Sequence, residues 1–119
     1  MDFREEKAIY LQITEHICEQ ILNGKLPAGE RIVSVREMAA ALEVNPNTVM
    51  RSYNELSDKE ILQNKRGVGF FVSENAAEII RNEQREKFIQ EELPRFLKKM
   101  RLLGIRMSEI IQFEQDINK

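Results

Sequence analysis

The sequence predicts a mainly α-helical protein with a small β-hairpin: an N-terminal winged helix-turn-helix domain followed by a C-terminal two-helix dimerisation tail. Three observations lead to this fold class. Two short helical segments are joined by Glu43 and Val44 alone, which is the sequence form of a helix-turn-helix. A glycine-containing hairpin pattern follows them directly. A glycine-free, charged amphipathic stretch then occupies residues 76–103.

The length and composition favour one small globular domain with an appendage. The chain has 119 residues, of which 42% are hydrophobic and 32% charged. No apolar run approaches the roughly 18 residues that a membrane span requires. The charged N-terminus lacks the apolar core of a signal peptide. We therefore expect a cytoplasmic protein with no membrane partner.

Residues 7–23 are expected to form the first helix. Isoleucines recur at every fourth position, which gives the helix one apolar stripe: Ile9, Ile13, Ile17 and Ile21. Gly24 is a natural C-terminal stop. We expect the single cysteine, Cys18, to be buried and the single histidine, His16, to be exposed. One cysteine and one histidine do not form the ligand cluster of a metal site, so we expect no metal and no cofactor.

The second helix is expected to begin after Ser34. The Ser34 side chain can cap the free backbone N–H groups of the first turn, and Glu37 completes a capping-box pattern. Arg36 is left pointing outward in the same turn. The expected buried stripe consists of Val35, Met38, Ala39 and Leu42.

The third helix has the pattern of a recognition helix. Asn45 is a good N-cap, and Pro46 suits the first helical position because its missing N–H costs nothing there. One face is apolar, with Val49, Tyr53 and Leu56. The other face carries side chains able to reach base edges or phosphates: Asn47, Thr48, Arg51 and Asn54.

A β-hairpin is predicted next, with one strand starting at Ile61 and Leu62 and the other at residues 70–72. Residues 63–69 are expected to form the turn between them. Lys65, Arg66 and Gly67 give this turn a basic tip, which suits a wing that lies on phosphates or enters a minor groove.

The tail is expected to form a second domain, so that the winged helix-turn-helix comprises residues 1–75 and the tail residues 76–119. Pro94 should kink or split the long tail helix, and Ser108 is a candidate cap for a last short helix. So short a segment cannot enclose a core alone. Its apolar stripes must pack on the first domain or on a second copy of the chain. We favour a homodimer, because helix-turn-helix proteins commonly read two half-sites as dimers.

Several motifs occur in order and together resemble the GntR family of bacterial winged-helix regulators over roughly residues 8–73. They are Tyr10-Leu11-Gln12-Ile13, Ser34-Val35-Arg36-Glu37-Met38-Ala39, Val44-Asn45-Pro46-Asn47-Thr48-Val49 and Lys65-Arg66-Gly67-Val68-Gly69-Phe70-Phe71-Val72. The short tail is similar to that of the YtrA-like branch, whose members lack a large effector domain and dimerise through those helices.

The resemblance implies roles for individual residues. Arg36 matches a DNA-contacting residue of the family, and Arg66 with Gly67 matches the wing tip that approaches the minor groove. The front of the recognition helix, where family members touch bases and phosphates, corresponds to Asn45, Asn47 and Thr48, followed by Arg51 in an outward position.

This sequence also departs from the family pattern. Glu43 and Glu60 replace usual glycines, Val33 replaces a usual proline, and Met50 replaces a base-reading arginine of other branches.

The predicted function is therefore a sequence-specific DNA-binding transcriptional regulator, a repressor that binds a two-fold symmetric operator in double-stranded DNA as a homodimer. The alternative is a winged-helix adaptor for protein–protein contacts, which the net charge of −2 supports. An enzyme is not expected, because the sequence shows no evident nucleophile–base pair and no phosphate-cradling loop, and we therefore name no catalytic residue. The sequence does not identify a small-molecule effector.

Overall fold

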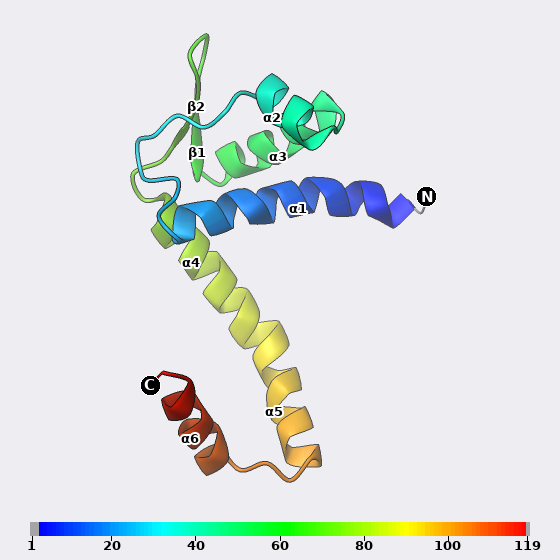
Figure 1. The fold of residues 1–119 in the computed structure, drawn as a ribbon, viewed down its shortest axis with the longest axis vertical. Helices are drawn as coiled ribbons and strands as arrows, with labels where there is room; N and C mark the ends of the chain where they lie inside the picture. The colour runs from blue at the N-terminus through cyan, green and yellow to red at the C-terminus, as the bar shows by residue number, and fades with distance from the viewer. Residues whose placement is uncertain (1–2, 119) are drawn as a thin grey trace. The chain divides into compact units, whose positions relative to one another are not determined.

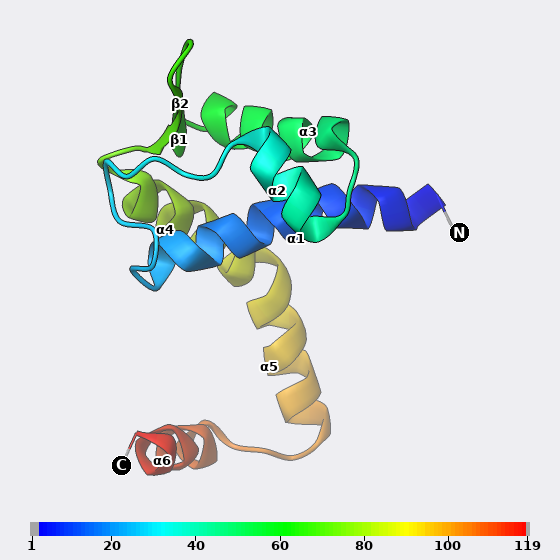
Figure 2. The ribbon, with the colours of Figure 1, turned by 45° about the horizontal axis from the view of Figure 1, so that its top comes forward.

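The computed structural model describes the backbone of residues 3–118 and the side-chain surroundings of residues 9–118, so Met1, Asp2 and Lys119 lie outside the described residues. The chain divides into two compact units, one ending at Asn82 and the other starting at Glu83. The first unit contains α1 (Phe3–Leu22), α2 (Val35–Leu42), α3 (Pro46–Asp58), β1 (Leu62–Lys65), β2 (Gly69–Val72) and the first part of α4 (Ala76–Lys87). Both views show α3 alongside α1, with the hairpin beyond the C-terminal end of α3 (Figure 1, Figure 2).

The core of the first unit lies between α1 and α3 and confirms the apolar stripes expected for both helices. Val49, Tyr53 and Leu56 of α3 are each 0% exposed. The facing stripe of α1 is buried as well and consists of Ile13, Ile17, Cys18 and Ile21. His16 is exposed, as expected. The first helix starts at Phe3, earlier than expected, and ends at Leu22 before Gly24, whose φ is 83°.

Two buried hydroxyl groups also join α1 to α3. The Oγ1 of Thr14 and the Oγ of Ser52 lie 2.6 Å apart. Thr14 donates its own hydrogen to the carbonyl oxygen of Tyr10, 3.0 Å away, so Ser52 is the donor between the two side chains. Each buried hydroxyl therefore has a partner, and burial leaves neither donor unsatisfied.

Helix α2 begins as expected after Ser34, whose Oγ accepts a hydrogen bond from the backbone N–H of Glu37 at 3.1 Å. Ala39 is buried, and Val35 with Met38 is partly buried. Leu42 was expected in the same stripe but is 47% exposed. The reason is that α2 ends at Leu42, and Val44, after the turn, packs against the core instead.

Tyr53 connects α3 to two neighbouring segments. Its hydroxyl donates to the carbonyl oxygen of Val33 at 2.8 Å, in the loop before α2. Its ring meets that of Phe70 in β2 edge-on, with 5.1 Å between centroids. Burial, with a smaller contribution from the carboxylate of Glu37, raises the pKa of Tyr53 to about 12. The phenol is therefore held in its neutral, donating form.

The predicted hairpin is present, but its strands are longer and its turn is shorter than expected. β1 and β2 pair antiparallel with Leu62 opposite Val72 and Lys65 opposite Gly69, so the expected turn over residues 63–69 contributes several residues to the strands. The sequence pattern also missed a further pairing. Arg31, in the loop before α2, forms an antiparallel bridge with Phe71, which adds an edge to the hairpin.

Two glutamates occupy left-handed backbone conformations. Glu43 follows α2 with φ 55°, and Glu60 follows α3 with φ 64°. A side chain in this region places Cβ close to the carbonyl oxygen that follows, which is why glycine is favoured there. Glycine, which is usual at these two positions in the family that the sequence resembles, adopts this conformation without strain. Glu43 and Glu60 adopt it with strain.

Replacing Glu60 with glycine is expected to stabilise the protein by about 0.5–1 kcal/mol, because the relief of strain exceeds the entropy that glycine adds to the unfolded chain. Urea denaturation at fixed protein concentration measures the change. Glu78→Gly is the matched control, since Glu78 lies exposed in the regular helix α4 and should lose about 1 kcal/mol. Equal losses in both variants would contradict the assignment of strain to Glu60.

The second unit contains the end of α4, a π-helical segment η1 (Phe88–Glu92), α5 (Leu93–Leu102) and α6 (Met107–Ile117). Pro94 was expected to kink or split the tail helix; the helical backbone instead continues past it, with a π-helical turn just before the proline. The backbone N–H of Leu93 bonds to the carbonyl oxygen of Phe88, five residues earlier. This wider turn accommodates a proline ring that would collide with the preceding turn of an α-helix.

The last helix begins at Met107, two residues earlier than a Ser108 cap would require. Arg106 is its N-cap, and the carboxylate of Glu109 accepts the backbone N–H of Arg106 at 2.7 Å. The acidic side chain at the third helical position thus satisfies the free donor, and Ser108 lies exposed inside the helix.

Large apolar side chains of the second unit are exposed in the single chain. Among the residues of this unit that the structure describes, Met100 is the one that is buried. At least 44% of the surface is exposed for each of Phe88, Ile89, Phe96, Leu102, Leu103, Met107, Ile111, Phe113 and Ile117. We call this set the tail surface.

The boundary between the two compact units lies inside α4, between Asn82 and Glu83. Ala76 and Ile80 belong to the core cluster of the first unit, so the start of α4 is part of that unit. Among the described residues, no helix is long and apolar enough to cross a membrane.

Candidate nucleic-acid interface

The front of α3 is built by a local capping arrangement. The Oδ1 of Asn45 accepts the backbone N–H of Asn47 at 2.8 Å, and Pro46 occupies the first helical turn, as predicted. Asn45, Pro46 and Asn47 are exposed, and Thr48 is half-buried. The first turn contains no acidic side chain, so the positive end of the helix dipole is not neutralised within the helix. This end of α3 therefore favours anionic groups.

Arg51 lies on the same helix but does not project freely into solvent. Its guanidinium carbon lies 4.0 Å from the centroid of the Tyr10 ring of α1, a cation–π contact. This contact between two helices far apart in the chain was not predicted from the sequence. A signal was available, because Tyr10 belongs to one of the motifs that carry the family resemblance.

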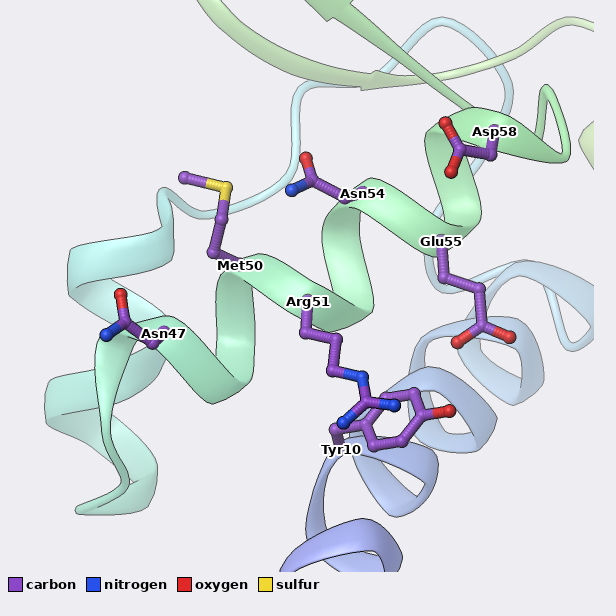
Figure 3. Close-up of a pocket in the computed structure, with 7 residues that line it drawn as sticks. All are labelled: Tyr10, Asn47, Met50, Arg51, Asn54, Glu55 and Asp58. Carbon is purple, nitrogen blue, oxygen red and sulfur yellow. The ribbon is translucent and has the colours of Figure 1, made fainter.

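A shallow groove along α3, with Tyr10 of α1 as a further lining residue, brings together three of the side chains predicted on the polar face of this helix. Asn47 and Arg51 line it with Tyr10, Met50, Asn54, Glu55 and Asp58 (Figure 3). In Figure 3, Arg51 and Glu55 point toward α1, whereas Met50 and Asn54 point to the other side of α3. Helix α3 thus has two edges along the groove, and the edge with Arg51 and Glu55 is the one that faces α1.

The two ends of α3 differ in charge. Arg51 is in the N-terminal half, whereas Glu55 and Asp58 are in the C-terminal half, where Glu55 pairs with Lys59 at 3.6 Å. Carboxylates repel phosphates, so the N-terminal half is the end that can approach a polyanion. The charge pattern therefore fixes the polarity with which α3 can dock.

The basic tip of the hairpin is a tight turn. The backbone N–H of Val68 bonds to the carbonyl oxygen of Lys65 at 2.9 Å, and Gly67 has φ 75°, a conformation that favours glycine. Lys65, Arg66 and Gly67 are all exposed. This matches the predicted wing, and a tip of this shape can lie on a phosphate backbone.

The remaining predicted residues lie at the start of α2, where Ser34 is the cap and Arg36 is exposed in the first turn. The predicted site residues thus occupy three places in the first unit: the start of α2, the front of α3 and the hairpin tip. No group of three or more metal-binding side chains occurs among the residues that the structure describes.

Comparisons with known proteins agree with this geometry. The family model described as "Bacterial regulatory proteins, gntR family" matches residues 9–72. The chain is 39% identical over 110 residues to the uncharacterized HTH-type transcriptional regulator YhcF of Bacillus subtilis (strain 168), covering 92% of this chain and 89% of YhcF. It is 31% identical over 118 residues to the HTH-type transcriptional repressor YtrA of the same organism, covering 99% of this chain and 90% of YtrA.

A solved structure gives the same result for the fold. The crystal structure of a putative transcriptional regulator of the GntR family from Bacteroides thetaiotaomicron superposes with a TM-score of 0.77 at 43% identity. The alignment covers 92% of this chain and 95% of that chain, so both units contribute to the likeness.

Proposed function

The chain belongs to the GntR family of bacterial regulatory proteins, and we propose that it is a repressor that binds a two-fold symmetric DNA operator as a homodimer. The observation that carries the proposal is the front of α3, where a capped, acid-free helix start presents Asn45, Asn47 and Thr48. Side chains of this kind on the N-terminal part of a recognition helix read base edges in the major groove.

The other predicted residues receive complementary roles. Ser34 and Pro46 fix the starts of α2 and α3, and Arg36 contacts phosphate beside the major groove. The hairpin tip, formed by Lys65, Arg66 and Gly67, lies along the adjacent backbone and minor groove. Because the net charge of the chain is −2, these local cations must supply the attraction to DNA.

Arg51→Ala is expected to weaken operator binding by about 5- to 150-fold while changing binding to unrelated DNA little. The reason is that the Tyr10 ring holds the guanidinium beside the part of α3 that we propose meets the bases. Titration of the variant against operator and scrambled duplexes measures both. Arg81→Ala, at an exposed position of α4 outside the groove, should leave both affinities unchanged. An equal loss on all sequences would instead assign Arg51 to a phosphate.

The tail supports the dimer. The second unit leaves nine large apolar side chains exposed, and burying them against a second copy removes this surface from water. We propose that residues 1–75 form the DNA-binding domain and residues 76–119 the dimerisation tail. The start of α4, which is part of the first unit, then connects the two functions.

Repression is proposed because the relative YtrA is named a repressor, and because a dimer on its operator blocks access to that stretch of DNA. Such a protein acts in the cytoplasm, where bacterial DNA is located.

Selection from random-sequence duplex pools at two salt concentrations, followed by sequencing, tests the proposed function. Enrichment of a two-fold symmetric site that persists at the higher salt concentration is the expected result. Binding without enrichment, lost at moderate salt, would overturn sequence-specific recognition. It would favour a winged-helix adaptor, for which the net charge of −2 is the supporting observation.

A further inference from the structure

Arg31 lies on an extra edge of the hairpin that the sequence pattern did not reveal. Backbone hydrogen bonds join the loop before α2 to β2 on both sides of Arg31. The N–H of Val72 donates to the carbonyl oxygen of Glu30 at 2.8 Å, and the N–H of Ile32 donates to the carbonyl oxygen of Phe70 at 2.9 Å. Arg31 therefore sits directly opposite Phe71.

The side chain of Arg31 lies on the outer face of the hairpin. Alternate residues of a strand face opposite sides, and Phe70 and Val72 face the core. Phe71 and Gly69 therefore face outward, together with Arg31 and with Lys65, which pairs with Gly69.

Gly69 makes room for the Arg31 side chain. A Cβ atom at position 69 would lie 2.7 Å from the Nε of Arg31 and 3.3 Å from its Cζ. The guanidinium therefore passes over the backbone of Gly69, two residues closer to the hairpin tip than its own backbone partner Phe71. The side chain is directed along β2 toward the basic tip.

Lys65 completes the arrangement from the other strand. Its Nζ lies 4.3 Å from the centroid of the Phe71 ring, so Lys65 and Arg31 approach β2 from its two sides. Arg66 follows at the tip. We call Arg31, Lys65 and Arg66 the wing ridge. Arg31 is exposed, and within residues 9–118 no carboxylate lies within ion-pair distance of it, so its charge is available to a ligand.

We propose that Arg31 is a DNA-contacting residue that binds a backbone phosphate and extends the contact of the wing from its tip along β2. A guanidinium presents its donors in a planar fork that suits a phosphate, and the one on Arg31 lies over the backbone of Gly69. The same loop continues to Arg36 at the start of α2, so it connects two cations assigned to the DNA backbone. The inference rests on the proposed DNA-binding function.

The salt dependence of operator binding tests the inference. Arg31→Gln removes the charge and keeps a polar side chain at this position, and Arg31→Lys keeps the charge. Arg31→Gln should lower the slope of log affinity against log salt by about 0.9 and weaken binding by about tenfold at 0.1 M salt, equally on matched and mismatched operators. Arg31→Lys should retain the slope of the unmodified protein.

Two further variants serve as controls. Arg66→Ala removes a predicted wing contact and should lower the slope as well. Lys25→Ala removes an exposed cation from the turn after α1 and should leave it unchanged. An unchanged slope in Arg31→Gln, alongside a lowered slope in Arg66→Ala, would overturn the role of Arg31 alone. Absence of DNA binding by the unmodified protein would instead overturn the proposed function.

Discussion

Replacing Ile111 with aspartate is expected to convert the dimer to monomers and to weaken operator binding by about 10²- to 10⁴-fold. Ile111 lies on α6 and is 53% exposed in the single chain, so the fold of one chain does not require its burial. In the proposed dimer it is covered by the second copy, where a carboxylate would lose its water without gaining a partner. Two half-sites would then be bound independently, and the advantage of linked binding would be lost.

Sedimentation equilibrium measures the dimer, and titrations of whole and half operators measure the DNA affinity. Ser108→Asp is the matched control. It adds the same charge to the same helix at an exposed position near the N-terminus, where a negative charge is favourable. If Ile111→Asp remained a dimer with unmodified affinity, the tail surface would not be the dimer interface.

Replacing Tyr53 with alanine is expected to lower the free energy of unfolding by about 3–5 kcal/mol, which is a large part of the stability of a small domain. The side chain is 0% exposed, and its removal leaves a cavity between α3 and β2. Urea denaturation followed by circular dichroism measures the loss. A loss below about 1 kcal/mol would mean that the core closes around the cavity.

Tyr53→Phe separates the hydroxyl from the ring. It should cost about 0.5–1.5 kcal/mol near neutral pH, because the carbonyl oxygen of Val33 loses its donor. The pH dependence adds a second signature. In the unfolded chain Tyr53 ionises near its ordinary pKa of 10.0, whereas burial holds the folded pKa near 12. Stability from this group is therefore complete below pH 10 and is lost as the pH rises toward 12, and Tyr53→Phe should lack this loss.

Features set by neighbouring residues could be predicted from the sequence. The Asn45 cap and the position of Pro46 depend on a few consecutive residues, and both occur as expected. The buried stripe of Val49, Tyr53 and Leu56 depends only on helical periodicity.

Features set by distant residues could not be predicted in this way. The bridge between Arg31 and Phe71 and the stacking of Arg51 on Tyr10 join residues far apart in the chain, and periodicity carries no information about such pairs. The response to Pro94 was also open, because a kink, a break or a π-turn each relieves the same collision. The exposure of Leu42 depends on where α2 ends, which helical periodicity does not determine.

The hydroxyl pair between Thr14 and Ser52 also has a mechanical consequence. Apolar contacts between two packed helices have no preferred direction, whereas a hydrogen bond between two short side chains is satisfied at one offset only. The hydrogen bond between Thr14 and Ser52 therefore fixes the position of α3 along the axis of α1. In the proposed complex α3 meets base edges within hydrogen-bonding tolerance, so a slip of half a helical turn along α1 would place its side chains opposite the wrong base pair. In that proposal, the accuracy of reading depends on two buried oxygen atoms between α1 and α3.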